Sequence, residues 1–320
     1  MNRLHYAGIM SCYVCSAACR HCMYACAPSM PKAFMTSDMA EYICATLAHA
    51  NVRSVHIGGG EPFLNFESLV LTIEAMNRHG IALNYIETNA SWCINEQHVR
   101  ERLRTLKQLG ATCVMASVDP FHIEFVPLER PLMLVGELRA AGFEYFIWQE
   151  RYLRKLLPLD HSRPIPHDEL KAALGAHYIE QAMREYGLTL NGRALKYADR
   201  LVTRRPLGAH LSSSPCHLLD GSHCHADLFG NIVPSGCPGI AIELTDFLRG
   251  TVPEHKYPVA SRLMNGGLSS LYAYAQQHGF QPDDTGYVSP CALCHAIRAH
   301  LLTTRPSADI GPACYYRAMA

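Results

Sequence analysis

The stretch Cys15-Ser-Ala-Ala-Cys19-Arg-His-Cys22 carries three cysteines in the spacing C-x3-C-x2-C. It directly follows the apolar run of residues 4–14, which predicts a buried strand. Three thiolates on one loop can bind three irons of a cubane cluster and leave the fourth iron open for another ligand. A structural zinc site would instead use four protein ligands. The spacing therefore favours an iron–sulfur cluster with one open iron.

Two neighbouring cysteines leave an alternative open. Cys12 precedes Cys15 by three positions, and Cys26 follows Cys22 by four. Either thiol could complete a four-ligand zinc site or a closed cluster.

A second motif, Gly58-Gly59-Gly60-Glu61-Pro62, ends the next predicted strand, residues 52–59. Consecutive glycines let the backbone approach a ligand closely, and a carboxylate beside them can hold an ammonium group. Alone, such a turn is weak evidence. After the cysteine loop, it indicates a site for a ligand with an amino-acid end, such as S-adenosylmethionine.

Strands and helices alternate through the first half of the chain. The sequence predicts strands over residues 4–14, 52–59, 81–89, 112–119 and 143–150, and helices over residues 36–50, 66–80, 95–110 and 131–142. Thr36 or Ser37 is the expected N-cap of the first helix, and Gly80 and Gly110 are expected C′ glycines. This order predicts an α/β fold, a parallel sheet or barrel with the helices outside.

Ligands of such folds bind at the carboxyl ends of the strands. Asn89 ends the third predicted strand, and Ser117 and Asp119 end the fourth. The alternative for Asn89 and Asp119 is that they only cap the following turns. Trp148 ends the fifth strand, where core packing is the competing explanation.

The character of the chain changes near residue 206. Residues 206–320 are rich in Cys, His, Gly and Pro, which predicts a boundary between a domain of residues 1–205 and a smaller one of residues 206–320.

Composition limits the partners and the compartment. Lys and Arg total 28, as do Asp and Glu, so general attraction to nucleic acid or to an anionic membrane is not expected. The first residues do not resemble a signal peptide, and no run of 18 apolar residues predicts a membrane span. We therefore expect a cytoplasmic protein. Its 14 cysteines, clustered at short spacings in two regions, indicate metal ligation rather than disulfides.

Together, the cysteine loop and the glycine motif resemble the radical S-adenosylmethionine (SAM) superfamily. The resemblance implies a partial (β/α)6 TIM-type barrel in which Cys15, Cys19 and Cys22 hold a [4Fe–4S] cluster. It implies that Gly58, Gly59, Gly60 and Glu61 contact the methionine part of SAM, with Asn89, Ser117 and Asp119 as further cofactor contacts. His21 stands where the family usually has Tyr or Phe. A flavodoxin- or ferredoxin-type protein would deliver the electron that cleaves SAM into methionine and a 5′-deoxyadenosyl radical.

The C-terminal region resembles the SPASM or twitch domain that holds an auxiliary cluster in such enzymes. A predicted hairpin with the turn Gly230-Asn-Ile-Val-Pro234 is followed by Cys237, and Cys291-Ala-Leu-Cys294 comes later. The expected ligands of a second [4Fe–4S] cluster are Cys216, Cys237, Cys291 and Cys294. A zinc site using Cys216 or Cys224 with the other three thiols is the alternative, and neighbouring histidines could also serve as ligands.

Among such enzymes, the pattern is most similar to peptide-modifying, epipeptide epimerase-like members. The segment Ala25-Cys26-Ala27-Pro28 and the Asp119-x-x-His122 pair carry this similarity. Those epimerases use a cysteine as hydrogen donor after the hairpin proline, where this chain has Pro234-Ser-Gly-Cys237. Cys224 and Cys314 are the substitutes to consider.

Three hypotheses follow. The first is a radical SAM enzyme that abstracts hydrogen from a peptide or peptide-like substrate. The second is a radical SAM oxidoreductase acting on a small metabolite. No peptide-recognition winged helix is expected before the barrel, which favours small substrates or a short peptide. The third is a zinc or iron–sulfur binding protein without catalysis.

Overall fold

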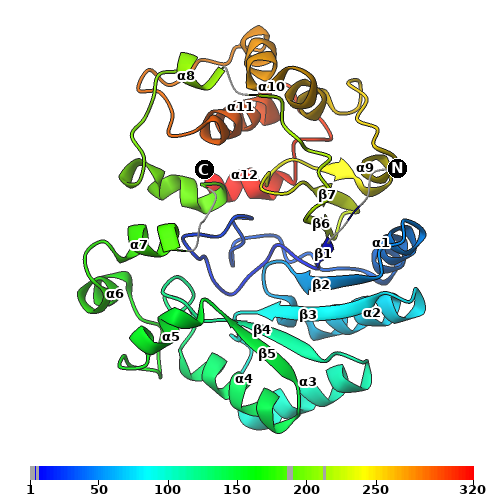
Figure 1. Ribbon diagram of the computed structural model, residues 1–320, viewed down its shortest axis with the longest axis vertical. Helices are drawn as coiled ribbons and strands as arrows, with labels where there is room; N and C mark the ends of the chain where they lie inside the picture. The colour runs from blue at the N-terminus through cyan, green and yellow to red at the C-terminus, as the bar shows by residue number, and fades with distance from the viewer. Residues whose placement is uncertain (1–3, 5–6, 186–189, 212–213) are drawn as a thin grey trace.

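A mixed sheet forms the centre of the molecule, in a computed structural model that describes residue 4 and residues 7–185, 190–211 and 214–320 (Figure 1). Its strand order is β5-β4-β3-β2-β1-β6-β7-β8. Six strands run parallel: β1 (Ala7–Met10), β2 (Ser54–Gly58), β3 (Ala82–Thr88), β4 (Cys113–Ser117), β5 (Glu144–Trp148) and β6 (Cys224–Asp227). β7 (Asn231–Val233) and β8 (Ile242–Glu243) are antiparallel. The predicted α/β class and partial barrel are confirmed.

Four helices cover the outer face of the barrel strands: α1 (Ser37–His49), α2 (Phe66–Arg78), α3 (Glu96–Gln108) and α4 (Glu129–Ala140). Each of the first three begins at a polar side chain that accepts a backbone N–H, and Thr36 is the cap of α1 as predicted. Gly80 and Gly110 end α2 and α3 with positive φ, which glycine adopts without strain.

The sixth parallel strand comes from an unexpected part of the chain. β6 lies in the Cys-rich region and pairs with β1, where Gly8 is in register with His225. After β5 the described chain forms helices instead: α5 (Glu150–Leu156), α6 (His167–Leu174), α7 (Tyr178–Glu185) and the 3-10 helix η2 (Gly192–Arg200). Gly175, with φ of 101°, separates α6 from α7.

Helices of the C-terminal region form the upper lobe in Figure 1. They are α8 (Gly208–Leu211), α9 (Leu244–Arg249), α10 (Pro258–Gln277), α11 (Pro290–Thr304) and α12 (Ala313–Met319). The hairpin β6–β7 joins this lobe to the barrel sheet, and it contains the predicted turn at Gly230. The domain boundary at residues 205 and 206 stays a prediction, since one sheet continues across it.

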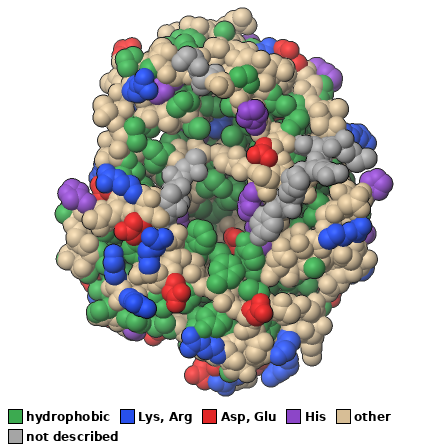
Figure 2. All heavy atoms as spheres, in the orientation of Figure 1, with side chains coloured by type: hydrophobic (Ala, Val, Ile, Leu, Met, Phe, Trp, Pro, Cys, Tyr) green, Lys and Arg blue, Asp and Glu red, His purple; other side chains and the backbone are tan. Residues whose placement is uncertain are grey.

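The face of the molecule seen in Figure 2 is hollowed between the two lobes, and hydrophobic side chains surround the hollow. None of the helices in the described ranges is both long enough and apolar enough to cross a bilayer.

Candidate functional site: two cysteine cavities

Cys15, Cys19 and Cys22 meet in one cavity of about 110 Å³ at the carboxyl ends of the barrel strands. The polar ends of three neighbouring strands line the same cavity: Gly59 and Gly60 after β2, Thr88 and Asn89 at the end of β3, and Ser117 of β4. The parallel sheet explains this meeting, because the ends of parallel strands share one edge of the sheet.

Arg193 fixes the cysteine loop. Its buried guanidinium donates hydrogen bonds to the carbonyl oxygens of Cys19, Ala25 and Cys26 at 2.6, 2.7 and 2.8 Å. The backbone N–H of Arg193 also donates to the Cys22 carbonyl at 3.0 Å. A side chain about 170 residues away in sequence therefore sets the backbone that presents the thiols.

The glycine motif packs directly against the cysteine loop. A Cβ at Gly60 would lie 2.0 Å from the Val14 carbonyl oxygen, and Gly59 has φ of 133°. The N–H groups of Gly60 and Glu61 donate to the carbonyls of Cys12 and Val14 at 2.8 and 3.0 Å. The motif is glycine-rich because two backbones touch here.

Glu61 is fully buried. Its carboxylate accepts hydrogen bonds from the backbone N–H of Phe63 and Asn89 and from the Thr88 hydroxyl. It is not among the described residues that line the cavity. Burial raises the pKa of this carboxyl to about 7, although the hydrogen bonds that it accepts lower the pKa. Glu61 thus holds the end of β3, and its expected contact with the methionine part of SAM stays a prediction.

Asn89 does face the thiols. Its side-chain amide donates to the Cys15 sulfur at 3.4 Å and to the Ser16 hydroxyl at 3.0 Å. The turn-capping alternative also holds in part, since its Oδ1 accepts from the Ser91 N–H at 2.9 Å.

Asp119 lies behind the cavity. Its buried carboxylate accepts from the N–H groups of Phe121 and His122 and from His122 Nδ1 at 2.7 Å. His122 itself lines the cavity beside Cys19. Burial disfavours the imidazolium, but Asp119 holds the pKa of His122 well above its usual value. Asp119 therefore positions His122, and His21, also in the cavity wall, packs on Phe121 with ring centroids 4.6 Å apart.

The donors around the barrel cavity fit a [4Fe–4S] cluster and SAM. Three thiols converge on one space, and burial raises the pKa of the Cys15 and Cys19 thiols, a cost that bound iron offsets by favouring the thiolates. Cys26 lines the same cavity, so the alternative of a fourth thiol ligand stays open.

A second cavity, of about 100 Å³, brings together the four predicted auxiliary ligands, Cys216, Cys237, Cys291 and Cys294. Cys291 and Cys294 occupy the first turn of α11, which begins at Pro290 after the N-cap Ser289. Burial raises the pKa of Cys237 to about 12, although the neighbouring Arg298 opposes this shift.

Arg298 balances the charge of this second set of thiols. It is 5% exposed, lines the cavity, and donates to the Pro238 carbonyl and the Tyr316 hydroxyl at 2.9 and 2.8 Å. Four thiolates around an iron–sulfur cluster or a zinc ion carry net negative charge, which a buried guanidinium stabilises.

The two hydrogen-donor candidates lie elsewhere. The Cys224 thiol donates to the Asp220 carbonyl at 3.2 Å, and Cys314 lies buried on α12. Neither is among the described residues that line the barrel cavity. Core packing does not explain Trp148, because this residue is 42% exposed.

Three residues were not predicted as site residues: His122 and Arg298, which line the two cavities, and Arg193, which holds the cysteine loop. The Asp119-x-x-His122 spacing was a usable signal for His122. Nothing local in the sequence marks Arg193 or Arg298, because their partners are distant in the chain.

Comparison with known proteins decides the family. A model of the radical SAM superfamily matches residues 9–148, which include the end of β1, the cysteine loop and β2 to β5. Residues 9–148 are a radical SAM domain. The chain therefore contains a radical SAM domain, and this domain supports an enzyme over a binding protein without catalysis. The domain implies the [4Fe–4S] cluster and SAM that the cavity fits.

The chain is also similar, at low identity and with TM-scores below 0.5, to several solved structures. Native anSMEcpe with bound AdoMet is 13% identical, with 93% of this chain and 96% of that chain covered and a TM-score of 0.46. BtrN in complex with AdoMet and 2-DOIA is 12% identical, with 82% and 88% covered and a TM-score of 0.43. SuiB of Streptococcus suis bound to S-adenosylmethionine is 13% identical, with 90% and 76% covered and a TM-score of 0.38. No curated protein matches the chain significantly.

Proposed function

We propose that the chain uses Cys15, Cys19 and Cys22 to hold a [4Fe–4S] cluster and modifies a peptide or peptide-like substrate by hydrogen abstraction. The observation that carries the cofactor assignment is the single cavity in which these thiols meet the polar ends of β2, β3 and β4. When bound, the cluster and SAM supply a 5′-deoxyadenosyl radical for that abstraction.

The chain's own residues hold and orient these groups. Asn89 and Ser117 are the polar side chains best placed to contact SAM beside the thiols, and the N–H-rich glycine turn borders the same space. Arg193 and Asp119 act indirectly. Arg193 holds the backbone of the cysteine loop, and Asp119 positions His122. The surrounding protein excludes water and so protects a reactive radical.

Two features of β5 support a peptide over a small metabolite. β5 is the last strand of the sheet, and within the described residues no further strand pairs with its outer edge. An extended peptide can add to such an edge through main-chain hydrogen bonds. Phe146 and Trp148, at 39% and 42% exposure, offer aromatic surface on the same strand.

The second cavity supports an auxiliary [4Fe–4S] cluster on Cys216, Cys237, Cys291 and Cys294, in a SPASM- or twitch-like lobe. Its thiols come from three separate segments, so the cluster would also tie the upper lobe together. Zinc in the same four thiols is the alternative that metal analysis distinguishes.

The test is anaerobic reconstitution followed by iron and sulfide counting and by measurement of 5′-deoxyadenosine under dithionite. We expect about eight irons per chain in the wild type. Changing Cys15, Cys19 and Cys22 together to alanine should leave about four irons and abolish 5′-deoxyadenosine release.

Cys44→Ala is the matched control, because Cys44 is a fully buried thiol of α1 that lines neither cavity. This variant should keep both the iron content and SAM cleavage. Unchanged cleavage in the triple variant would refute the cofactor assignment.

Incubation with short synthetic peptides then tests the substrate class. Formation of 5′-deoxyadenosine that increases with peptide concentration, together with a mass or stereochemical change in the peptide, supports it. Stimulation only by small metabolites overturns it.

A further inference from the structure

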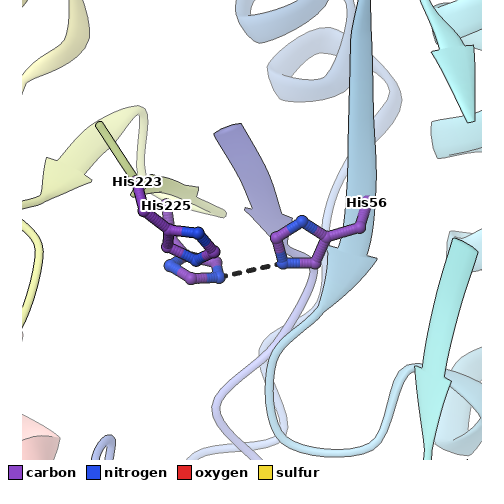
Figure 3. A group of neighbouring side chains, drawn as sticks. All are labelled: His56, His223 and His225. Atoms are coloured by element: carbon purple, nitrogen blue, oxygen red, sulfur yellow. Dashed lines mark hydrogen bonds between the residues drawn. The ribbon is translucent and has the colours of Figure 1, made fainter. Parts of the chain in front are cut away.

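Three histidines meet inside the barrel, beside the cysteine loop. His56 lies on β2 and His225 on β6, and both are in register with Gly8 on the strand between them. Their rings reach across this middle strand, so that the two Nε2 atoms are 3.0 Å apart (Figure 3). Side chains two strands apart can meet in this way only where the residue between them leaves room.

Gly8 provides that room. A Cβ at Gly8 would lie 2.4 Å from two atoms of the His56 ring and 2.5 Å from the His225 ring. Glycine in the middle of a strand weakens the strand and commonly marks a place where another group approaches closely. Gly8 therefore weakens β1 but lets these two imidazoles approach each other.

His223 adds a third ring, directly beside His225 in Figure 3. One ligand nitrogen from each of the three histidines lies within 4.8 Å of the others. The ring centroids are 5.0 Å apart for His56 and His225, 5.0 Å for His223 and His225, and 5.7 Å for His56 and His223.

These distances suit one shared metal ion. Two nitrogens bound at about 2.1 Å are about 3.0 Å apart at a right angle and about 3.4 Å apart at the tetrahedral angle. The corresponding ring centroids are about 4.5 to 5.2 Å apart. Two of the three pairs already meet this range, and the third is within about 0.5 Å of it.

The outer nitrogen of the His225 ring has a partner of the kind that orients a metal-bound histidine. The Tyr24 hydroxyl lies 2.8 Å from His225 Nδ1. Histidine ligands usually engage their second nitrogen with such an outer group, which fixes the ring with the first nitrogen aimed at the metal.

Glu87 connects this cluster to the barrel cavity. Its carboxylate lies 3.6 Å from His56 Nε2, and the same residue lines the cavity of Cys15, Cys19 and Cys22. A carboxylate at this position can serve as a fourth ligand or accept a proton from a metal-bound water.

We propose that His56, His223 and His225 form a binding site for a divalent transition-metal ion in the barrel, separate from both sets of cysteines. Imidazole nitrogens suit zinc, ferrous iron, nickel and copper, and the adjoining carboxylate favours zinc or ferrous iron over copper. The site does not depend on the proposed peptide substrate or on SAM cleavage.

The experiment uses the full chain after cluster reconstitution, with zinc as the probe. Zinc per chain is measured by mass spectrometry after equilibrium dialysis, and the ligands are identified by X-ray absorption at the zinc edge. We expect about one zinc with only nitrogen and oxygen neighbours at about 2.0 Å. His56→Gln and His223→Ala should each lower the zinc affinity by at least about tenfold while the iron content stays unchanged.

Two further variants make the result decisive. Gly8→Ala should lower zinc affinity without removing a ligand, because its methyl group fills the space between the rings. His49→Ala, an exposed histidine in the last turn of α1, should change nothing. If His56→Gln does not fold, His223→Ala decides the outcome, since His223 is on the surface side of the cluster. Equal zinc affinity in the wild type and His223→Ala, or sulfur neighbours at about 2.3 Å, would overturn the proposal.

Discussion

The two cavities of this chain both gather cysteine thiols, but they differ in where these thiols come from in the sequence and in what surrounds them. The barrel cavity takes its three predicted ligands from one loop, Cys15 to Cys22, and polar strand ends face them across the space. The cavity of the upper lobe takes four thiols from three separate segments and surrounds them mainly with apolar side chains and one buried guanidinium, Arg298.

This difference indicates different chemistry. Thiols on a single short loop can occupy only one side of a cluster, which leaves the opposite side for a ligand. Thiols that converge from several segments close around the cluster, and the bound group then stabilises the fold that brought them together. The barrel cavity is thus suited to reaction, and the upper cavity to structure or electron transfer.

The largest expected effect separates the two cavities directly. Cys19→Ala and Cys237→Ala should each lower the iron content from about eight to about four per chain. Cys19→Ala should reduce 5′-deoxyadenosine release by at least about a thousandfold, whereas Cys237→Ala should reduce it by less than about tenfold. Iron counting and the dithionite assay on the same samples check both outcomes. Equal loss of SAM cleavage in the two variants would show that the division of roles is wrong.

The next effect concerns the residues that hold each cavity. Arg193→Met removes three hydrogen bonds to the carbonyls of Cys19, Ala25 and Cys26, while leaving every thiol in place. Leaving buried acceptors without donors costs about 1–3 kcal/mol for each group. We expect SAM cleavage to fall by about tenfold to a hundredfold, because the loop no longer presents its thiols in one geometry. Arg193→Lys, which keeps the charge and can satisfy one carbonyl, should lie between the wild type and the methionine variant.

Arg298→Met provides the counterpart in the upper lobe. It removes the positive charge next to Cys237 and the bonds to Pro238 and Tyr316. We expect the second cluster to be lost more readily, with iron falling from about eight toward about four per chain during dialysis against a chelator. SAM cleavage should change by less than about threefold. A normal iron content after the same dialysis would mean that the guanidinium does not stabilise the thiolates.

Local patterns of the sequence predicted much of the fold. β1 to β5 and α1 to α3 lie within the expected ranges, and α4 begins two residues before its expected start, because apolar periodicity and helix caps such as Thr36 depend on neighbouring residues. The pairing of β6 with β1 was beyond such reasoning, since strand partners are chosen by tertiary packing and not by the strand's own residues.

The same limit applies to the sites. The four auxiliary cysteines were predicted because two of them share a C-x2-C spacing and a third follows a hairpin, and they meet in one cavity. Glu61 shows what a motif leaves out. The glycine turn predicts a carboxylate that contacts a ligand, and it does not reveal that Thr88 and Asn89, at the end of β3, donate hydrogen bonds to this carboxylate. The histidine cluster could likewise not be predicted from the sequence, because it depends on the register of β2, β1 and β6.

The smallest effect tests whether Glu61 is a positioning group of the barrel cavity. Its folded pKa of about 7 exceeds the ordinary value of 4.5, so the folded state binds a proton more tightly than the unfolded state. The free energy of unfolding should therefore fall as the pH rises from about 4.5 to about 7 and stay level above that, by about 3 kcal/mol at most. Glu61→Gln has no proton to lose, so its unfolding free energy should lack this decrease when denaturant unfolding is followed anaerobically from pH 5.5 to 8.5.

Two opposing forces on this carboxyl make the outcome informative. Burial favours the neutral acid, whereas hydrogen bonds from Thr88 and from the N–H groups of Phe63 and Asn89 favour the carboxylate. Equal pH slopes in the wild type and in Glu61→Gln would mean that the three donors prevail and that the carboxylate stays ionised. Its negative charge would then act on the neighbouring cysteine loop, where it contributes to the raised pKa of the Cys15 thiol. The pH slope thus decides whether the barrel cavity has a neutral or a negatively charged group behind its thiols. The wall of the upper cavity differs, because its charged group is the guanidinium of Arg298.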